Sequence, residues 1–154
     1  MDNAAMLWRL ALLLLFLMPF AANANHLGSP PAALPGGRII SVDEAKALLD
    51  AKGASFIDVR NPINYGRGHL PQAISIPFDG SADSPGDKAA LVKSLPKDKD
   101  KPLVIYSHGP TGWKSYRAAE AAIEAGYKNV YWMRDGFGAW EARGYPVKFG
   151  AERN

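Results

Sequence analysis

Short apolar runs alternate with helix-like segments along most of the chain. An apolar or β-branched run bounded by Gly, Pro or polar residues is typical of a buried strand. The clearest example is Leu-Val-Ile-Tyr at residues 103–106. Strands are predicted at residues 39–40, 56–59, 73–76, 103–106 and 130–132, with a last extended segment at 146–147.

The segments between these runs carry helix signals. Ser41 and Glu44 form a capping box, which satisfies two backbone amides at the start of a helix. Gly53 is expected to end that helix. Gly126 stands where an alanine-rich helix needs a left-handed residue after its last turn. Helices are predicted over residues 41–51, 87–95, 113–125 and 137–142.

This alternation predicts a three-layer α/β domain over residues 38–149. Its five strands should form a mostly parallel sheet with helices on both faces. Ligands of such domains bind beyond the carboxyl ends of the strands. Two segments, residues 60–71 and residues 107–112, are expected to project at that edge.

The first twenty-four residues have the pattern of a secretory signal peptide. Arg9 is followed by an apolar run from Leu10 to Met18, and Ala22-Asn23-Ala24 gives the small-x-small pattern of a cleavage site. The run is about half as long as the ~20 apolar residues of a membrane span. We therefore expect residues 1–24 to be cleaved and the protein to be periplasmic or secreted. An uncleaved N-terminal anchor is the alternative.

Both flanks of the predicted domain lack periodicity. Residues 25–37 contain three prolines and three glycines, which predicts a flexible linker. Residues 150–154 are expected to form a C-terminal tail.

Composition excludes several kinds of function. The 154 residues include no cysteine, so disulfides, thiolate chemistry and Cys-ligated metals are excluded for this chain acting alone. The net charge of +3 comes from basic residues interleaved with acids, as in residues 97–101, and not from a basic face. We expect no nucleic-acid partner, and no membrane partner once the leader is removed. The three histidines lack metal-ligand spacing, and no metal or cofactor is predicted.

Two motifs lie in the projecting segments. The first begins Asp58-Val59-Arg60 and reaches Gly68-His69-Leu70-Pro71, while the second runs from Val104 to Ser107 and ends at Lys114-Ser115. Together they resemble the rhodanese homology domain over nearly the whole predicted domain. Later residues also fit that family, namely Gly126, Tyr127, Val130, Trp132, Gly136 and Trp140.

The resemblance implies sulfur transfer through a cysteine after the central strand, which carries a persulfide. The loop here is similar to a subgroup that reads C-x-G-P-x-C, but Ser107 and Gly112 stand at the two cysteine positions. Serine cannot form a persulfide, and its hydroxyl stays protonated unless a base activates it. We therefore expect no sulfur transfer by that mechanism. Cysteine-dependent phosphatase activity, found on related folds, is excluded for the same reason.

The loop nevertheless keeps features of an anion site. Gly109 and Gly112 would permit unusual backbone angles with inward-pointing amides, and Lys114 adds positive charge at a helix start. A simple strand-to-helix turn inherited with the fold is the alternative. The candidate ligand-binding residues are Ser107, His108, Gly109, Thr111, Gly112, Trp113, Lys114 and Ser115.

Three further residues are expected to support this loop. Asp58 and Arg60 should form a salt-bridged scaffold at a strand end, unless Arg60 faces the pocket. His69 is expected to serve turn geometry. Neighbouring side chains on a tight loop rarely meet, so Ser107 and His108 are not expected to form a hydrolytic pair.

The sequence thus predicts an exported rhodanese-like domain that is inactive as a sulfurtransferase. It would bind a small anionic or sulfur-containing ligand, or a protein partner, at residues 107–114. The alternative is a sulfurtransferase-related enzyme or sulfur carrier that acts with a partner's thiol.

Overall fold

The computed structural model describes residues 28–80 and 85–150, without the side chains of residues 85 and 86. The predicted signal peptide and most of the predicted tail lie outside the described residues.

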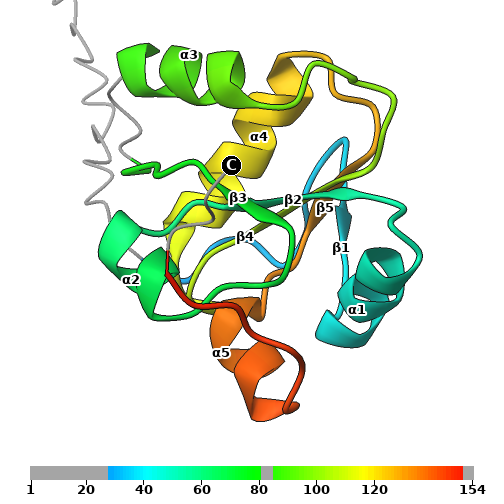
Figure 1. Ribbon diagram of the computed structural model, residues 1–154. Helices are drawn as coiled ribbons and strands as arrows, with labels where there is room; N and C mark the ends of the chain where they lie inside the picture. The colour runs from blue at the N-terminus through cyan, green and yellow to red at the C-terminus, as the bar shows by residue number, and fades with distance from the viewer. Residues whose placement is uncertain (1–27, 81–84, 151–154) are drawn as a thin grey trace, which may run out of the picture.

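A five-stranded parallel sheet forms the centre of the domain (Figure 1). The strand order is β1-β5-β4-β2-β3, and every neighbouring pair is parallel. The predicted fold class is therefore confirmed. The strands are β1 (Arg38–Ile39), β2 (Ser55–Asp58), β3 (Ala73–Ser75), β4 (Leu103–Tyr106) and β5 (Val130–Trp132).

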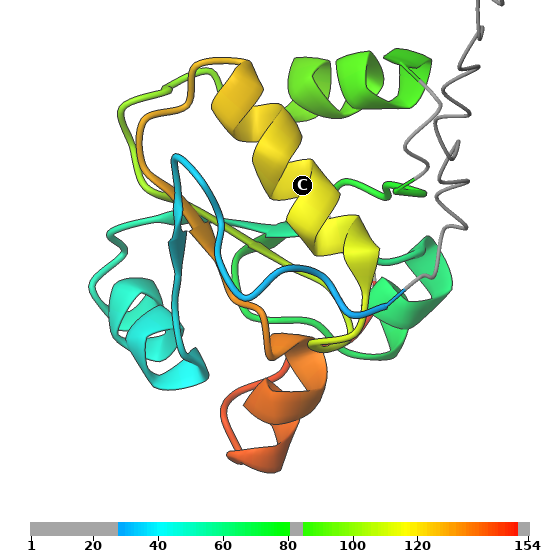
Figure 2. The same ribbon diagram turned by 180° about the vertical axis from the view of Figure 1, so that it is seen from behind.

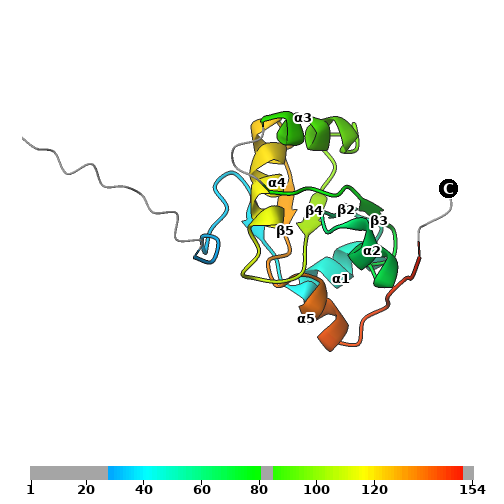
Figure 3. The ribbon, with the colours of Figure 1, turned by 90° about the vertical axis from the view of Figure 1, so that its left-hand side faces the viewer.

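Helices cover both faces of this sheet (Figures 1 and 3). Because side chains of a strand alternate between its faces, β4 divides its apolar residues between two cores. Leu103 and Ile105 pack with α3 and α4, whereas Val104 and Tyr106 pack with α1 and α5. The helices are α1 (Val42–Asp50), α2 (Pro62–Arg67), α3 (Pro85–Ser94), α4 (Trp113–Glu124) and α5 (Gly136–Ala142).

The helix ends follow the sequence signals with one difference. Ser41 and Glu44 form the predicted capping box of α1. Gly126, with φ +89°, takes the left-handed position after α4. After α1, however, the left-handed residue is Lys52, with φ +51°, and Gly53 follows it with its amide bonded to Leu48 O at 2.9 Å. Gly53 therefore completes the turn without being the residue that reverses the backbone.

The segment after β2, for which no helix was predicted, contains the short helix α2. Asn61 caps it, since its side chain accepts a hydrogen bond of 2.8 Å from the amide of Asn64. Pro62 occupies the first helical turn, where its missing N–H costs nothing. Six residues are too few to show helical periodicity, but the Asn-Pro pair was a usable start signal.

The described part of the predicted linker, residues 28–37, packs against the domain. Leu34 is only 5% exposed and belongs to the core beneath α4. A Cβ on Gly36 would lie 2.9 Å from Ile123 of that helix, which shows how closely the backbone approaches it. Figure 2 shows this segment, in blue, running beside α4. Proline and glycine content indicated a tether, but here it permits close packing. We call residues 28–37 the N-terminal strap.

Candidate functional site

The loop that connects β4 to α4, residues 107–112, lies at the carboxyl edge of the sheet; we call it the Ser107 loop. The start of α5 holds its first half, because the amides of Phe137 and Gly138 donate to the carbonyls of Ser107 and His108 at 2.9 and 3.0 Å. Gly136 makes this contact possible. It has φ +65°, and a Cβ there would lie 2.6 Å from Gly109 N.

Ser107 lies at the base of the loop and is 3% exposed. Its Oγ is 3.0 Å from Ser115 Oγ, in the first turn of α4. Ser115 in turn accepts a hydrogen bond of 3.0 Å from Trp132 Nε1 at the end of β5. The two serines at opposite ends of the predicted site are thus brought together, and both are buried.

Gly112 lies against Ser107 across the loop. A Cβ at this position would be 3.4 Å from Ser107 Oγ, so side chains at the two positions would touch. The expectation of unusual backbone angles is wrong, however. Gly112 has φ −84°, and neither it nor Gly109 is among the described glycines with positive φ. The loop turns with ordinary geometry, closed by a hydrogen bond of 3.3 Å from Gly112 N to Gly109 O.

The N-terminus of α4 faces the loop without a side-chain cap. Gly112 is the N-cap residue and has no side chain to accept from the first-turn amides. Such amides carry the positive end of the helix dipole. Thr111, the residue before the cap, is exposed at the loop's tip.

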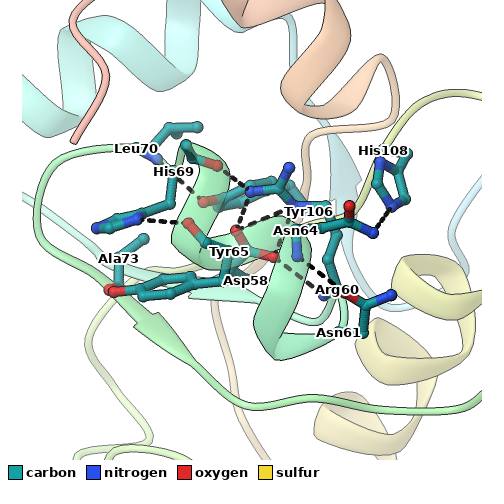
Figure 4. A network of polar contacts seen from close by, with 11 residues as sticks. Asp58, Arg60, Asn61, Asn64, Tyr65, His69, Leu70, Ala73, Tyr106 and His108 are labelled. Carbon is teal, nitrogen blue, oxygen red and sulfur yellow. Dashed lines mark hydrogen bonds and ion pairs between the residues drawn. The ribbon is translucent and has the colours of Figure 1, made fainter. Parts of the chain in front are cut away.

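His108 connects the Ser107 loop to α2. Its Nε2 lies 3.0 Å from Asn64 Nδ2, so the amide donates to a neutral ring (Figure 4). Partial burial lowers the pKa of His108 below its usual 6.5, and the nearby charges of Arg60 and Lys114 lower it further, against an opposing effect of Asp58. The imidazole nitrogen is therefore directed to Asn64 while Ser107 is directed to Ser115. The structure does not form a Ser107–His108 pair.

Asp58 and Arg60 form the expected internal ion pair. Arg60 Nη2 lies 2.7 Å from Asp58 Oδ2, and both side chains are almost fully buried. The same nitrogen donates to Gly68 O at 2.6 Å, which ties the end of β2 to the turn after α2. The guanidinium also lies 4.2 Å from the centre of the Phe137 ring. Arg60 is therefore part of the scaffold, although its charge reaches His108.

His69 has a structural setting. It is fully buried, stacks on the Tyr65 ring at 3.7 Å and lies 2.9 Å through Nδ1 from Tyr65 O. Its backbone pairs with Lys148 in an antiparallel bridge. This bridge, beyond the predicted extended segment at 146–147, fastens the last described residues to the turn after α2.

Trp113 and Lys114 lie at the rim. The Trp113 indole donates to Gly28 O at 2.6 Å, and Arg117 lies over its ring at 5.1 Å. The indole is thus already in contact with the N-terminal strap and with α4.

Lys114 is 42% exposed and lies 3.8 Å from Asp79 Oδ1. It also borders a cleft of about 500 Å³ that does not include Ser107. The cleft is lined by Asn61, Ser75, Ile76, Pro77, Phe78, Asp79, Asp87, Ala90, Leu91, Ser94 and Lys114.

Among the described residues, no group of three or more His, Asp or Glu side chains is placed to hold a metal ion. No helix in the described part of the chain has the length and apolar character to cross a membrane.

The region that contains β2, β4 and the Ser107 loop is similar to known proteins. The family model described as Rhodanese-like domain matches residues 41–143, from the N-cap of α1 to the end of α5. The chain belongs to the rhodanese-like domain family. As a rhodanese-like domain it is a single domain, and it departs from the family's cysteine chemistry, because the sequence has no cysteine.

Curated relatives match the same region. The tRNA uridine(34) hydroxylase of Sodalis glossinidius is 35% identical over 117 residues, which is 73% of this chain and 32% of the relative. The protein of that name from Erwinia tasmaniensis is 34% identical over the same shares. The chain thus spans about a third of the length of these relatives.

Solved structures share the fold. Thiosulfate sulfurtransferase from Pseudomonas aeruginosa superposes with a TM-score of 0.58 and 24% identity, over 77% of this chain and 21% of that one. A rhodanese-related protein from Thermoplasma volcanium gives 0.54 and 24%, over 72% and 97%. At these identities the likeness shows the fold alone.

The sequence located most of the site but missed three contributors. The eight predicted loop residues lie together, and their binding role stays a prediction. Asn64, Trp132 and Phe137 were not predicted to contact them. In the sequence, only the family pattern around Trp132 and Gly136 indicated that residues of β5 and α5 belong to the site.

Proposed function

We propose that this chain is an exported rhodanese-like domain that does not transfer sulfur and binds a small anionic or sulfur-containing ligand at residues 107–114. The observation that carries the proposal is the Ser107 loop itself. A serine stands at the nucleophile position, in a loop that leads into an uncapped helix N-terminus, and the charges of Arg60 and Lys114 reach the neighbouring His108.

Electrostatics supports an anionic ligand. The pKa of His108 is lowered most by burial, and then by the positive charges of Arg60 and Lys114 against an opposing effect of Asp58. These two basic side chains place positive charge near the loop, which favours an anion there. The dipole of α4 acts in the same direction.

Chemistry supports inactivity. A persulfide requires a thiolate, and the chain has none to offer. Ser107 also lacks a base, because its Oγ is hydrogen bonded to Ser115 and the His108 ring to Asn64. Export rests on the pattern of residues 1–24, which predicts a periplasmic or secreted location.

Ligand binding can be tested by thermal unfolding of the chain from Asn25 onward with millimolar thiosulfate, sulfite or thiocyanate. We expect at least one anion to raise Tm, because a ligand that binds only the folded state stabilises it by mass action. Lys114→Gln should reduce the shift, while Lys97→Gln, at a distant loop, should not. If no anion shifts Tm, the ligand proposal fails and a protein partner becomes the better hypothesis.

Inactivity can be tested by cyanide-dependent release of sulfite from thiosulfate. We expect none from the parent chain and measurable turnover from Ser107→Cys or from Ser107→Cys/Gly112→Cys. Turnover by the parent would contradict the proposal and favour the sulfurtransferase alternative. If neither cysteine variant is active, the loop has lost more than its nucleophile.

A further inference from the structure

The cleft that Lys114 borders lies between α3 and the segment that follows β3. Figure 1 shows this segment, residues 76–80, in green below α3. The cleft has a volume of about 500 Å³, and Ser107 is not among the residues that line it. Small-molecule sites in proteins have volumes of about 300–1,000 Å³. The cleft is therefore large enough for a small ligand and is separate from the base of the Ser107 loop.

One face of α3 explains why this space is not filled by the protein itself. Four residues of α3 with the spacing i, i+3, i+4 and i+7 share one face of the helix and line the cleft, namely Asp87, Ala90, Leu91 and Ser94. Leu91 is buried, whereas the other three are short and exposed. A closely packed helix carries larger apolar residues along such a face. The short side chains thus leave space between α3 and the opposite wall.

The opposite wall and the floor of the cleft are apolar. Ile76 and Phe78 are core residues whose side chains also line the cleft, and Pro77 between them is exposed. Together with Ala90 and Leu91 of α3, they offer an apolar group of a ligand contact on two sides.

The charged residues at the cleft are acidic overall, although the whole chain has a net charge of +3. They are Asp79, Asp87 and Lys114. Lys114 lies 3.8 Å from Asp79 Oδ1, so each offsets part of the other's charge. Asp87 makes no ion pair or hydrogen bond with another described residue. The neighbouring Lys88 is paired with Glu124 of α4 at 3.7 Å. The carboxylate of Asp87 is therefore available to a ligand.

We infer that this cleft binds a small organic cation, an amine that carries an apolar body. The apolar body lies against Pro77 and Ala90, and the ammonium group pairs with Asp87. An anion in the same place would meet two carboxylates and is disfavoured. The inference goes beyond the proposed function and does not depend on it, because the two sites take ligands of opposite charge.

The test compares three probes that share an apolar body and differ in charge: 2-phenylethylamine, 2-phenylethanol and phenylacetate. Each is titrated into the isotope-labelled protein, and the backbone amide resonances are followed by NMR. We expect the amine to shift the amides of α3 and to bind about two- to fivefold more tightly than the alcohol, the effect of one exposed ion pair. The acid should bind more weakly than either.

Three variants assign the effect to the cleft. Asp87→Asn should bring the affinities of the amine and the alcohol close together. Asp50→Asn, on α1 at the other face of the sheet, should leave their ratio unchanged. Ala90→Phe fills the cleft from an exposed position and should abolish binding of both probes.

Four results would overturn the inference. They are no binding of the amine, equal affinities of the parent for amine and alcohol, an unchanged ratio in Asp87→Asn, and amide shifts confined to residues 107–112. Failure of thiosulfate, sulfite and thiocyanate to bind would contradict the proposed function alone. The two proposals can thus fail separately.

Discussion

His108 is the side chain of the Ser107 loop whose charge changes nearest to neutral pH. Its pKa in the folded protein is lowered by burial and by Arg60 and Lys114. The unfolded chain, with a histidine pKa near 6.5, therefore binds a proton at a pH where the folded protein does not. The contribution of His108 to the free energy of unfolding is therefore unfavourable only at acid pH, and it lowers that free energy as the pH drops through and below 6.5.

We expect His108→Gln to remove part of this acid sensitivity. A glutamine can still bond to Asn64 but does not take up a proton. The measurement is urea unfolding of parent and variant at a series of pH values from neutral to mildly acidic. Equal losses of stability in both proteins would show that His108 is not responsible.

Gly136 offers a residue-scale test of how α5 holds the loop. A Cβ there would lie 2.6 Å from backbone atoms of residues 107–109, in addition to the cost of φ +65°. We expect Gly136→Ala to destabilise the fold by roughly 2–4 kcal/mol. Gly144→Ala is the matched control, since Gly144 has φ +67° but no atom within 4 Å of its Cβ position.

Urea unfolding of both variants isolates the steric part of this effect. Gly144→Ala should lower the free energy of unfolding only by the cost of the left-handed backbone, about 1–2 kcal/mol. If the two variants lose equal stability, the close approach of Gly136 to the loop contributes nothing.

Residue-level contacts show where sequence reasoning reaches its limit. The spacing of motifs located Ser107 and the Asp58–Arg60 pair, which lie at strand ends, and Gly112, which lies at the start of α4. It did not reveal that Trp132 donates a hydrogen bond to Ser115. That contact joins β5 to α4, and the position of one relative to the other is set by tertiary packing. Asn64 was missed because the short helix that carries it was not predicted.

At the scale of elements, the loop between β4 and α4 is short enough to bring its two ends into contact. A Cβ at Gly112 lies near Ser107 Oγ, whereas a Cβ at Gly109 has only Asp135 O nearby, at 3.8 Å. A disulfide requires such close approach of the two side chains. The loop geometry is thus suited to a bond between positions 107 and 112.

We predict that Ser107→Cys/Gly112→Cys forms an intramolecular disulfide on mild oxidation. Mass spectrometry should show the loss of two hydrogens, and thiol titration should find no free thiol. Ser107→Cys/Gly109→Cys should remain reduced under the same conditions. Free thiols in the first variant would mean that the loop opens in solution.

The same elements show which parts of the fold the sequence predicts. Strands were located to within about a residue because buried parallel strands are continuous apolar runs. Helix α4 was located by its alanine content and by Gly126. The left-handed Lys52 could not be foreseen, since glycine is the usual residue there and Gly53 stood one position later.

At the scale of the whole molecule, the N-terminal strap changes the boundary of the folded domain. The predicted domain began at Arg38, but the core includes Leu34, and Trp113 binds the carbonyl of Gly28. A composition rich in proline and glycine says nothing of what a single leucine within it contacts. The strap is thus part of the structure that supports α4.

This boundary can be tested by Leu34→Ala. Removal of a core leucine should lower the free energy of unfolding by about 2–4 kcal/mol. Ile63→Ala removes a side chain that is 67% exposed and should change stability by less than about 0.5 kcal/mol. Equal effects, measured by urea unfolding, would mean that the strap is detached in solution.

The strand order also determines when this protein can fold. In its all-parallel sheet, Arg38 of β1 pairs with Tyr131 of β5, from the opposite end of the domain. Parallel neighbours cannot form local hairpins, so each pairing must close a long loop, and such topologies fold slowly. If the chain is exported as proposed, N-terminus first through a translocation channel, the strap and β1 would emerge before their partners. Folding would then have to wait for almost the whole domain, and the chain would depend on protection from aggregation until β5 arrived.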